Sequence, residues 1–456
     1  MSTSRPLFDE SAFPQAAIRH ESLAYVTRCL SIGQCCAVVG LSNTGKSTLL
    51  RSLQRPSARV RCAQPGRSAP FVVFVDALDG AVPTEPSFYE LALRRLIQSA
   101  AEYGATDGRL ADVTRLHAAV LAGAAPLACR AYFAQAVHSL IGTNAAYDIV
   151  IVLDNFDDLL CELDAAPLRH LRALRDAYGA RLSYVLATTR PPDELRRDDA
   201  TYEFIELFQV YTHHLPPLTS QESETMLDYL YATTGSVLSP ALRELAIGLA
   251  GGHPGLLDRI CRTLVQEPAL ATVDEADAVS RLLSEPPIAA ECSRLIRGLS
   301  HDELLLLQRS VSGQGSTPSS LPPPRPSASL SELGAYVVRS PLLRAFVTAY
   351  HTADVQRSGV RCDLETGQIW LDGQEITLEL SEAQRRLLRH LYRHQGRVCG
   401  QQSIAEVIWD TADGVSPGAI YELVKRVRQK IEVDWRDPRL LITVPGEGYR
   451  LESPQG

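Results

Sequence analysis

A glycine-rich motif near the start of the chain constrains the fold most strongly. It reads Gly40-Leu41-Ser42-Asn43-Thr44-Gly45-Lys46-Ser47 and fits the pattern GxxxxGK[ST]. The apolar run Cys35–Val39 before it is typical of a buried strand, and Thr48–Leu53 after it is predicted to be helical. In this setting glycines let backbone N–H groups turn inward around phosphate oxygens, and the helix N-terminus adds partial positive charge. The motif therefore predicts a strand–loop–helix unit that binds phosphate.

The residues of this loop have distinct expected roles toward a nucleoside triphosphate. Lys46 is expected to reach the β- and γ-phosphates, and the Ser47 hydroxyl to ligate Mg²⁺. The remaining binding positions are expected at Gly40, Asn43, Thr44, Gly45 and Thr48. A second apolar strand, Ile149–Leu153, ends in Asp154 about 110 residues further on, the arrangement that holds Mg²⁺ directly or through water. The predicted cofactors are ATP (or ADP) and Mg²⁺.

Length and composition limit the classes of protein that fit. The chain has 456 residues, which is too long for one ordinary core, and its 45% apolar and 21% charged residues are globular proportions. No apolar run approaches the roughly 20 residues that span a bilayer, the N-terminus has no apolar signal core, and the ten cysteines are scattered. These features predict a soluble cytoplasmic protein with no membrane partner. A net charge of −8 argues against a bulk nucleic-acid coat.

Alternating strand-like and helical runs in the first half predict an α/β sheet. Helices are expected over residues 90–143, and the strand signal stops at about Thr219, where Thr219 or Ser220 caps a helix. The five strand candidates are Cys35–Val39, Phe71–Val75, Ile149–Leu153, Leu182–Ala187 and Phe208–His214.

Roughly residues 15–350 resemble the AAA+ and STAND P-loop ATPases, which have a parallel sheet and a helical lid. The resemblance implies a catalytic acid directly after Asp154, but Asn155 stands there and an amide cannot act as a base. Either hydrolysis is slow, or Asp157 or Asp158 stands in. We therefore expect ATP binding with slow ATP hydrolysis, and we name Asp157 as a candidate catalytic residue beside Lys46 and Asp154.

Further motifs support this resemblance. Thr188-Thr189-Arg190 is similar to the sensor segment of STAND proteins, which implies that Arg190 senses the γ-phosphate. Gly251-Gly252-His253-Pro254-Gly255 is similar to the GxP motif, which implies that Pro254 contacts the base or ribose. Arg19-His20-Glu21 lies where these families carry a GRE-like box. Arg196 and Arg197 are candidate arginine fingers for a neighbouring subunit, and a homo-oligomer is expected when ATP is bound.

The resemblance also gives a domain plan. We expect an ATPase domain at 1–217, a helical lid at 218–285, and a small winged-helix domain at 286–356. The Ser/Pro-rich stretch 312–330 would be a loop inserted in this small domain. A separate α+β domain is predicted at 357–456.

The pattern of residues 357–456 is more informative than their charge, since 14 Lys/Arg oppose 15 Asp/Glu. Ser381 and Gln384 form a capping box before a helix, and Ser416-Pro417 starts another helix that extends to Glu432. A hairpin follows at 441–451. The stretches LSEAQRRLLRHL, GRVCGQQSIAEVIW, VKRVRQKIE and TVPGEGYRL together resemble the OmpR/PhoB-type winged helix-turn-helix domain. That family places the second of these helices in the major groove, which implies double-stranded DNA as a partner.

The second helix supplies most of the expected DNA contacts. Its apolar stripe is expected to pack inward, so that basic side chains face the phosphates. Tyr421 and Glu422 are candidates for base edges, since Glu can accept from a cytosine amino group. Backbone contacts are expected from Lys425, Arg426, Arg428 and Lys430, with Arg450 in the hairpin as a further DNA contact. Pro445 replaces the usual Arg before the wing glycine.

Three functions fit this organisation. The leading hypothesis is an ATP-switched DNA-binding regulator, most naturally of transcription, in which nucleotide controls assembly or domain arrangement. The alternatives are an AAA+ ATPase that loads or recruits proteins on DNA, as in replication initiation or transposition, and a STAND-type defence sensor. A protein partner is left open.

Overall fold

The computed structural model describes residues 18–79, 84–103, 109–142, 147–234, 238–296, 299, 301–311, 328–354, 359–364, 366–371, 374–409, 417–432, 435, 438, 440–444 and 447–452. It divides into two compact units. One comprises Met1–Leu295 with Pro322–Leu343, and the other comprises Ile296–Leu321 with Arg344–Gly456. We describe each unit by itself.

The first unit is built on a five-stranded parallel sheet. Its strands are β1 (Cys36–Val39), β2 (Phe71–Asp76), β3 (Ile149–Asp154), β4 (Leu182–Thr188) and β5 (Thr212–His214). Their spatial order is β2-β3-β4-β1-β5. All pairings are parallel, so the carboxyl ends of the strands share one edge of the sheet. The predicted α/β class is confirmed.

Four predicted strands are present, and the fifth prediction was wrong over half its length. Phe208 and Gln209 belong to helix α10 (Tyr202–Gln209), and β5 begins only at Thr212. The reason is the spacing of Phe204, Ile205 and Phe208, which places all three on one buried helix face.

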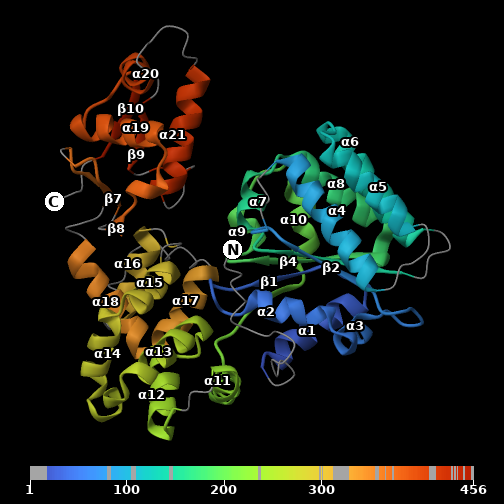
Figure 1. The fold of residues 1–456 in the computed structure, drawn as a ribbon, viewed down its shortest axis with the longest axis horizontal. Helices are drawn as coiled ribbons and strands as arrows, with labels where there is room; N and C mark the ends of the chain where they lie inside the picture. Colours follow the sequence, from blue (N-terminus) through green and yellow to red (C-terminus); the bar gives the residue numbers. More distant parts are fainter. Residues whose placement is uncertain are drawn as a thin grey trace, which may run out of the picture. The chain divides into compact units, whose positions relative to one another are not determined.

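Helices cover both faces of the sheet (Figure 1). One face bears α1 (His20–Ser31), α2 (Lys46–Arg51), η1 (Ser52–Gln54) and α3 (Pro56–Cys62). The predicted helices of 90–143 lie on the other face as α4 (Glu85–Glu102), α5 (Arg109–Leu121) and α6 (Pro126–Ile141), with α7 (Asp157–Glu162), α8 (Ala165–Tyr178) and α10. Alternate strand residues point to opposite faces, so in β2 Val72 and Phe74 pack in one core and Val73 and Val75 in the other. The short η2 (Gly179–Arg181) and α9 (Pro192–Leu195) flank β4.

A helical segment follows the sheet. The Thr219 hydroxyl accepts from Glu222 N at 3.2 Å, and Thr219 N donates to Glu222 Oε2 at 2.9 Å, which confirms the capped helix start. The first helices are α11 (Ser220–Thr234), α12 (Pro240–Ala250), α13 (Pro254–Gln266), η3 (Pro268–Thr272) and α14 (Glu275–Ser284). They are followed by α15 (Pro286–Ile296), α16 (His301–Val311), α17 (Ala328–Arg339) and α18 (Pro341–Asp354).

The described residues of 286–356 form helices, apart from Leu299 and Ser340, and none of them forms a strand, so the winged-helix fold of this segment stays a prediction. Most of the predicted inserted loop, residues 312–327, lies outside the described residues. The loop's last three residues, 328–330, already form the first turn of α17.

The C-terminal domain lies in the second unit and has the predicted order of elements. It contains β6 (Val360–Cys362), β7 (Ile369–Leu371), β8 (Gln374–Glu375), η4 (Thr377–Glu379), α19 (Glu382–Arg393), α20 (Gln401–Trp409), α21 (Pro417–Ile431) and the hairpin β9 (Leu441–Val444) and β10 (Gly448–Leu451). The capping box of Ser381 and Gln384 is present. The apolar stripe of α21 is buried in one core with the hairpin residues Leu441, Tyr449 and Leu451.

Candidate functional site

The glycine-rich loop joins the end of β1 to the start of α2. Gly45 has φ 92°, a left-handed conformation that favours glycine, while an added Cβ would meet nothing within 4 Å. The need for glycine at this position is therefore conformational. Asn43 is also left-handed, with φ 57°, and the Thr44 hydroxyl donates to Leu41 O at 2.7 Å. The loop is thus closed by its own hydrogen bonds, as the sequence motif requires.

Lys46 lies inside this loop with 7% of its surface exposed. Its Nζ donates to the carbonyl oxygens of Gly40 and, at 3.0 Å, Leu41. Burial lowers the pKa of Lys46, and the carboxylates of Asp157 and Asp154 oppose that change. An ammonium group is therefore held where the motif predicts the phosphates.

Asp154, at the end of β3, places a buried carboxylate beside the loop. It is fully buried, and its Oδ1 accepts from Asn155 N at 3.0 Å. Its Oδ2 has no hydrogen-bond partner among the residues that the structure describes. Burial raises the pKa of Asp154, while a hydrogen bond from Ser47 opposes the rise. An unsatisfied buried carboxylate oxygen next to a hydroxyl is the donor set that Mg²⁺ takes, so these residues fit the metal.

The structure separates the acids that follow Asp154. Asn155, with φ 51°, donates from Nδ2 to Asp76 Oδ1 at 2.9 Å. Asp157 Oδ1 accepts from Thr189 N at 2.8 Å and from Thr189 Oγ1 at 2.6 Å, which ties it to the end of β4. Asp158 is exposed. Of the two acids predicted to replace the missing carboxylate at position 155, Asp157 is thus the one that the structure brings to the loop. Asp76 is a further acid, which sequence reasoning missed.

The predicted sensor and finger arginines have different surroundings. Arg190 follows Thr189 directly, and its carbonyl accepts from the Thr188 hydroxyl at 2.6 Å. Arg196 donates to Leu160 O at 2.9 Å and pairs with Asp198, so its guanidinium is used within its own domain. Arg197 is exposed and donates to Asp193 O at 3.1 Å.

The predicted GxP motif lies against the glycine-rich loop. Pro254 is the first residue of α13, and His253 caps that helix by accepting from Leu256 N. The His253 Nδ1 is therefore the acceptor, and Nε2 donates to Ser42 O at 3.1 Å. Burial lowers the pKa of His253 to about 4, which keeps it neutral. Gly255 has no room for a side chain, since a Cβ would meet Asn43 at 2.8 Å.

Two buried acids of the helical segment also contact this loop. Glu291 in α15 accepts from Asn43 Nδ2 at 2.8 Å and pairs with Arg259 and Arg294. Glu332 in α17 accepts from Leu41 N at 3.1 Å through Oε1, and its Oε2 is unpartnered among the described residues. Burial raises the pKa of Glu332 to about 7. Sequence reasoning missed both acids.

Arg19 clasps the loop from its N-terminal side. It is buried, has φ 61°, and donates from Nη2 to Thr44 O at 3.0 Å and from Nη1 to Pro216 O. Its backbone N donates to Glu222 Oε1 at 2.7 Å. The GRE-like position named from the sequence is therefore part of the same site.

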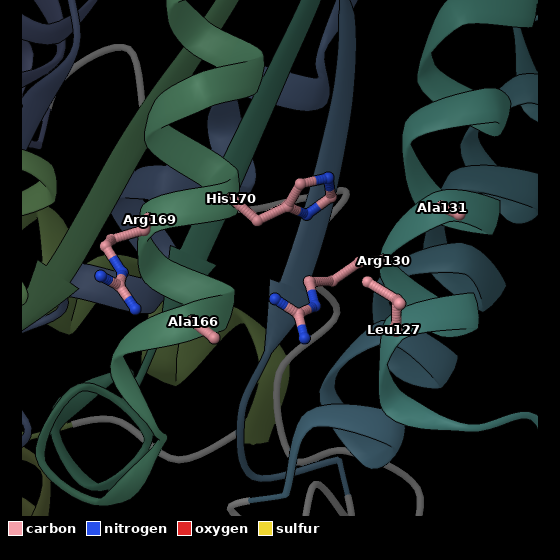
Figure 2. Close-up of a pocket in the computed structure, with 6 residues that line it drawn as sticks. All are labelled: Leu127, Arg130, Ala131, Ala166, Arg169 and His170. Atoms are coloured by element: carbon pink, nitrogen blue, oxygen red, sulfur yellow. The ribbon is translucent and has the colours of Figure 1, made fainter.

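A hollow of about 490 Å³ lies between α6 and α8 (Figure 2). Arg130 and His170 extend into it, whereas Arg169 points away. Arg130 pairs with Glu85 at 2.6 Å, and His170 Nδ1 bonds to Tyr89 Oη at 2.7 Å. Both polar groups are already engaged within the domain, so we assign no binding role to this hollow.

The candidate DNA-binding face lies on α21. Tyr421 is 52% exposed, and Glu422, Arg426 and Lys430 are exposed as well. Lys425 is half-buried, with its Nζ 5.1 Å from the centre of the Trp435 ring. These side chains share the solvent-facing surface that the sequence assigned to DNA.

Two basic residues differ from this group. Arg428 is only 8% exposed and donates from Nε to Leu441 O at 2.9 Å and from Nη2 to Thr443 Oγ1 at 2.7 Å. Burial lowers the pKa of Arg428. Its charge is thus directed at the hairpin. Arg450 pairs with Glu452 in the same hairpin, with a contact of 2.8 Å from Nε.

Comparison with known families agrees with both halves of this description. Residues 19–186 match the model of the AAA ATPase domain, and residues 373–451 match that of the transcriptional regulatory protein, C terminal. The chain therefore carries an AAA ATPase domain and an OmpR/PhoB-type winged-helix DNA-binding domain, which confirms the two resemblances found in the sequence.

Curated relatives match about a quarter of the chain or less. The transcriptional regulatory protein CusR of Escherichia coli (strain K12) is 36% identical over 115 residues, which are 25% of this chain and 49% of that protein. The sensory transduction protein RegX3 of Mycobacterium tuberculosis is 40% identical over 95 residues, 21% of this chain and 40% of that protein. The chain spans half or less of the length of these relatives.

Solved structures with a similar fold include the ORC2 protein of Aeropyrum pernix in its ADP form. It is 17% identical, has a TM-score of 0.44, and the match covers 80% of this chain and 92% of that chain. The ORC1 protein of the same organism in complex with DNA is 16% identical, with a TM-score of 0.40 and coverage of 79% and 91%. At such identities the likeness concerns the fold alone. Within the described residues, no helix is long and apolar enough to cross a membrane.

Proposed function

We propose that this protein is an ATP-switched DNA-binding regulator of transcription. The observation that carries the proposal is the set of contacts between the nucleotide loop and three helices of the helical segment. His253, Glu291 and Glu332 each bond a different residue of the loop. A ligand that enters the loop must act on these contacts, so its binding free energy is linked to the arrangement of the helical segment.

The nucleotide would be held by the residues already described. Backbone N–H groups of 43–48 would bind the phosphates and Lys46 would neutralise their charge. Mg²⁺ would be ligated by Ser47 and by the unsatisfied oxygen of Asp154. When bound, the metal would offset phosphate charge. Pro254 would contact the base or ribose, and Arg190 would sense the γ-phosphate.

The order of elements along the chain links the glycine-rich loop to the DNA-binding domain. The last of these three helices along the chain is α17, and α18 and β6 follow it in sequence. An added negative charge at the loop repels the ionised carboxylate of Glu332, and this repulsion weakens the contact that holds α17 at Leu41. We propose that ATP in this way frees the C-terminal half to assemble as a homo-oligomer on double-stranded DNA, with Tyr421, Glu422, Lys425, Arg426 and Lys430 facing it.

The test measures duplex DNA binding and particle size together. DNA sites selected with the full chain are titrated without nucleotide, with ADP and with ATP, and mass is followed by light scattering. We expect ATP to raise DNA affinity at least tenfold and to increase particle mass. Lys46→Ala should lose both responses, because the cation in the loop is gone.

Arg115→Ala is the matched control, since Arg115 is 74% exposed on α5 and lies in the same unit. It should retain both responses. DNA affinity that is the same in all nucleotide states and in Lys46→Ala would refute the switch.

A further inference from the structure

The residue after Asp154 poses a chemical problem for ATP hydrolysis. Hydrolysis needs a group that orients the attacking water and accepts its proton, and carboxylates serve this purpose. Asn155 has no basic atom. Its side chain is nevertheless held in a defined position, because its left-handed backbone and the 2.9 Å bond from Nδ2 to Asp76 Oδ1 fix it. The Asn155 amide is therefore hydrogen-bonded to a carboxylate on the neighbouring strand.

Asp76 is the last residue of β2 and is the register partner of Asp154 on β3. Adjacent strands lie about 4.8 Å apart, so the two carboxylates stand side by side at the edge of the sheet where the glycine-rich loop begins.

The remaining contacts of Asp76 fix it but leave it room for water. Its Oδ1 also accepts from Leu78 N at 3.1 Å, and its Oδ2 pairs with Arg51 at 3.2 Å. A carboxylate has about four lone-pair positions, so these three donors, which are those found among the described residues, leave one position on Oδ2. Asp76 also lines a hollow of about 220 Å³ between β2 and α4, together with Arg51 and Tyr103.

We propose that Asp76 is the catalytic carboxylate of ATP hydrolysis and that Asn155 is its positioning residue. This inference rests on the proposed function, since it requires ATP at the loop. The water oxygen attacks the γ-phosphorus and forms the new P–O bond, while its proton passes to Asp76. The bond from the γ-phosphorus to the bridging oxygen breaks, and ADP leaves with phosphate. The acid is thus supplied by β2 instead of β3.

Asp157 is the competing candidate, and its contacts suit another role. Both donors of Thr189 bind one of its oxygens, and its charge acts on Lys46. These contacts join the loop to the end of β4, where Arg190 lies. We therefore assign Asp157 a structural role, in which it links the glycine-rich loop to the end of β4.

The experiment compares single-turnover ATP hydrolysis, ATP affinity by calorimetry and thermal unfolding in the full chain. Asp76→Asn keeps the size of the side chain and an oxygen that accepts from Asn155 and Leu78, but it removes the basicity and the acceptor for Arg51. We expect its hydrolysis rate to fall at least 100-fold with ATP affinity changed less than threefold. Asp112→Asn, an exposed acid on α5, is the matched control and should hydrolyse like the wild type. Asp157→Asn should keep more activity than Asp76→Asn.

Asn155→Ala is a second test variant. It removes the Asn155 contact of Asp76 and leaves Asp76 bound to Arg51 and Leu78. It should lower the rate about tenfold at unchanged ATP affinity, a split that a merely structural role would not produce. A rate in Asp76→Asn within tenfold of the wild type would overturn the proposal, as would ATP binding by the wild type with no turnover, with or without duplex DNA. Absence of ATP binding by the wild type would instead refute the proposed function.

Discussion

Replacing Glu332 with Gln tests whether the charge of this buried acid in α17, which contacts the glycine-rich loop, lowers the stability of the folded chain. Glu332 is 9% exposed, and only its Oε1 has a hydrogen-bond partner, Leu41 N, among the residues described. Burial raises its pKa from 4.5 to about 7, although Lys46 and Arg19 lie near enough to oppose the rise. Gln keeps the acceptor for Leu41 N and removes the charge.

The size of the effect follows from this pKa change. Because the folded-state pKa lies above the unfolded value, the native chain binds a proton that the unfolded chain releases between about pH 4.5 and 7. The stability that Glu332 contributes is complete below pH 4.5 and is lost as the pH rises through 7. A rise from 4.5 to about 7 corresponds to about 3 kcal/mol.

The assay is thermal unfolding of the full chain, free of nucleotide, at pH 5 and pH 8. At roughly 2 °C for each kcal/mol in a large domain, Glu332→Gln should unfold about 6 °C above the wild type at pH 8 and close to it at pH 5. Glu244→Gln, an exposed acid on α12, should follow the wild type at both values. Equal differences between Glu332→Gln and the wild type at the two pH values would refute the reasoning.

Three further outcomes are expected. Lys46→Ala should abolish ATP binding in calorimetry, and retained affinity would remove the assignment of the loop. Arg426→Ala and Lys430→Ala should each lower the slope of log affinity for DNA against log salt by about one, whereas a side chain that does not touch phosphate leaves the slope unchanged. Arg428→Ala should destabilise the hairpin by about 2 kcal/mol, seen as faster hydrogen exchange at 441–451, and unchanged exchange would contradict its buried contacts.

Local patterns were enough to predict much of the fold. The strand that precedes the glycine-rich loop, the strand that ends at Asp154, and the capping boxes at Thr219 and Ser381 each depend on residues within a few positions of one another. Such signals are complete in a short window of sequence. The segment Phe208–His214 shows the limit, because its apolar residues fit a strand while their buried partners lie one helical turn earlier, at Phe204 and Ile205.

The candidate site was only partly predictable for a related reason. The loop residues were found because their spacing is fixed by phosphate geometry. Glu332 was missed because its partner, Leu41, lies 291 residues away, and nothing in the sequence around either residue indicates the pairing. Asp76 and Asn155 are 79 residues apart and meet only because β2 and β3 are neighbours.

The charge pattern of α21 predicted a basic helix face, but it did not show that Arg428 is buried against the hairpin. Arg428 lies one residue after the buried Val427 and one turn before Glu432, whose Oε1 accepts from Leu440 N and Leu441 N. Arg428 donates to Leu441 O, so the two side chains satisfy both backbone groups of the same hairpin residue. A buried hairpin start needs these partners. The boundary between solvent-facing and hairpin-facing cations on α21 is therefore set by where β9 begins, and the helix pattern alone does not contain that information.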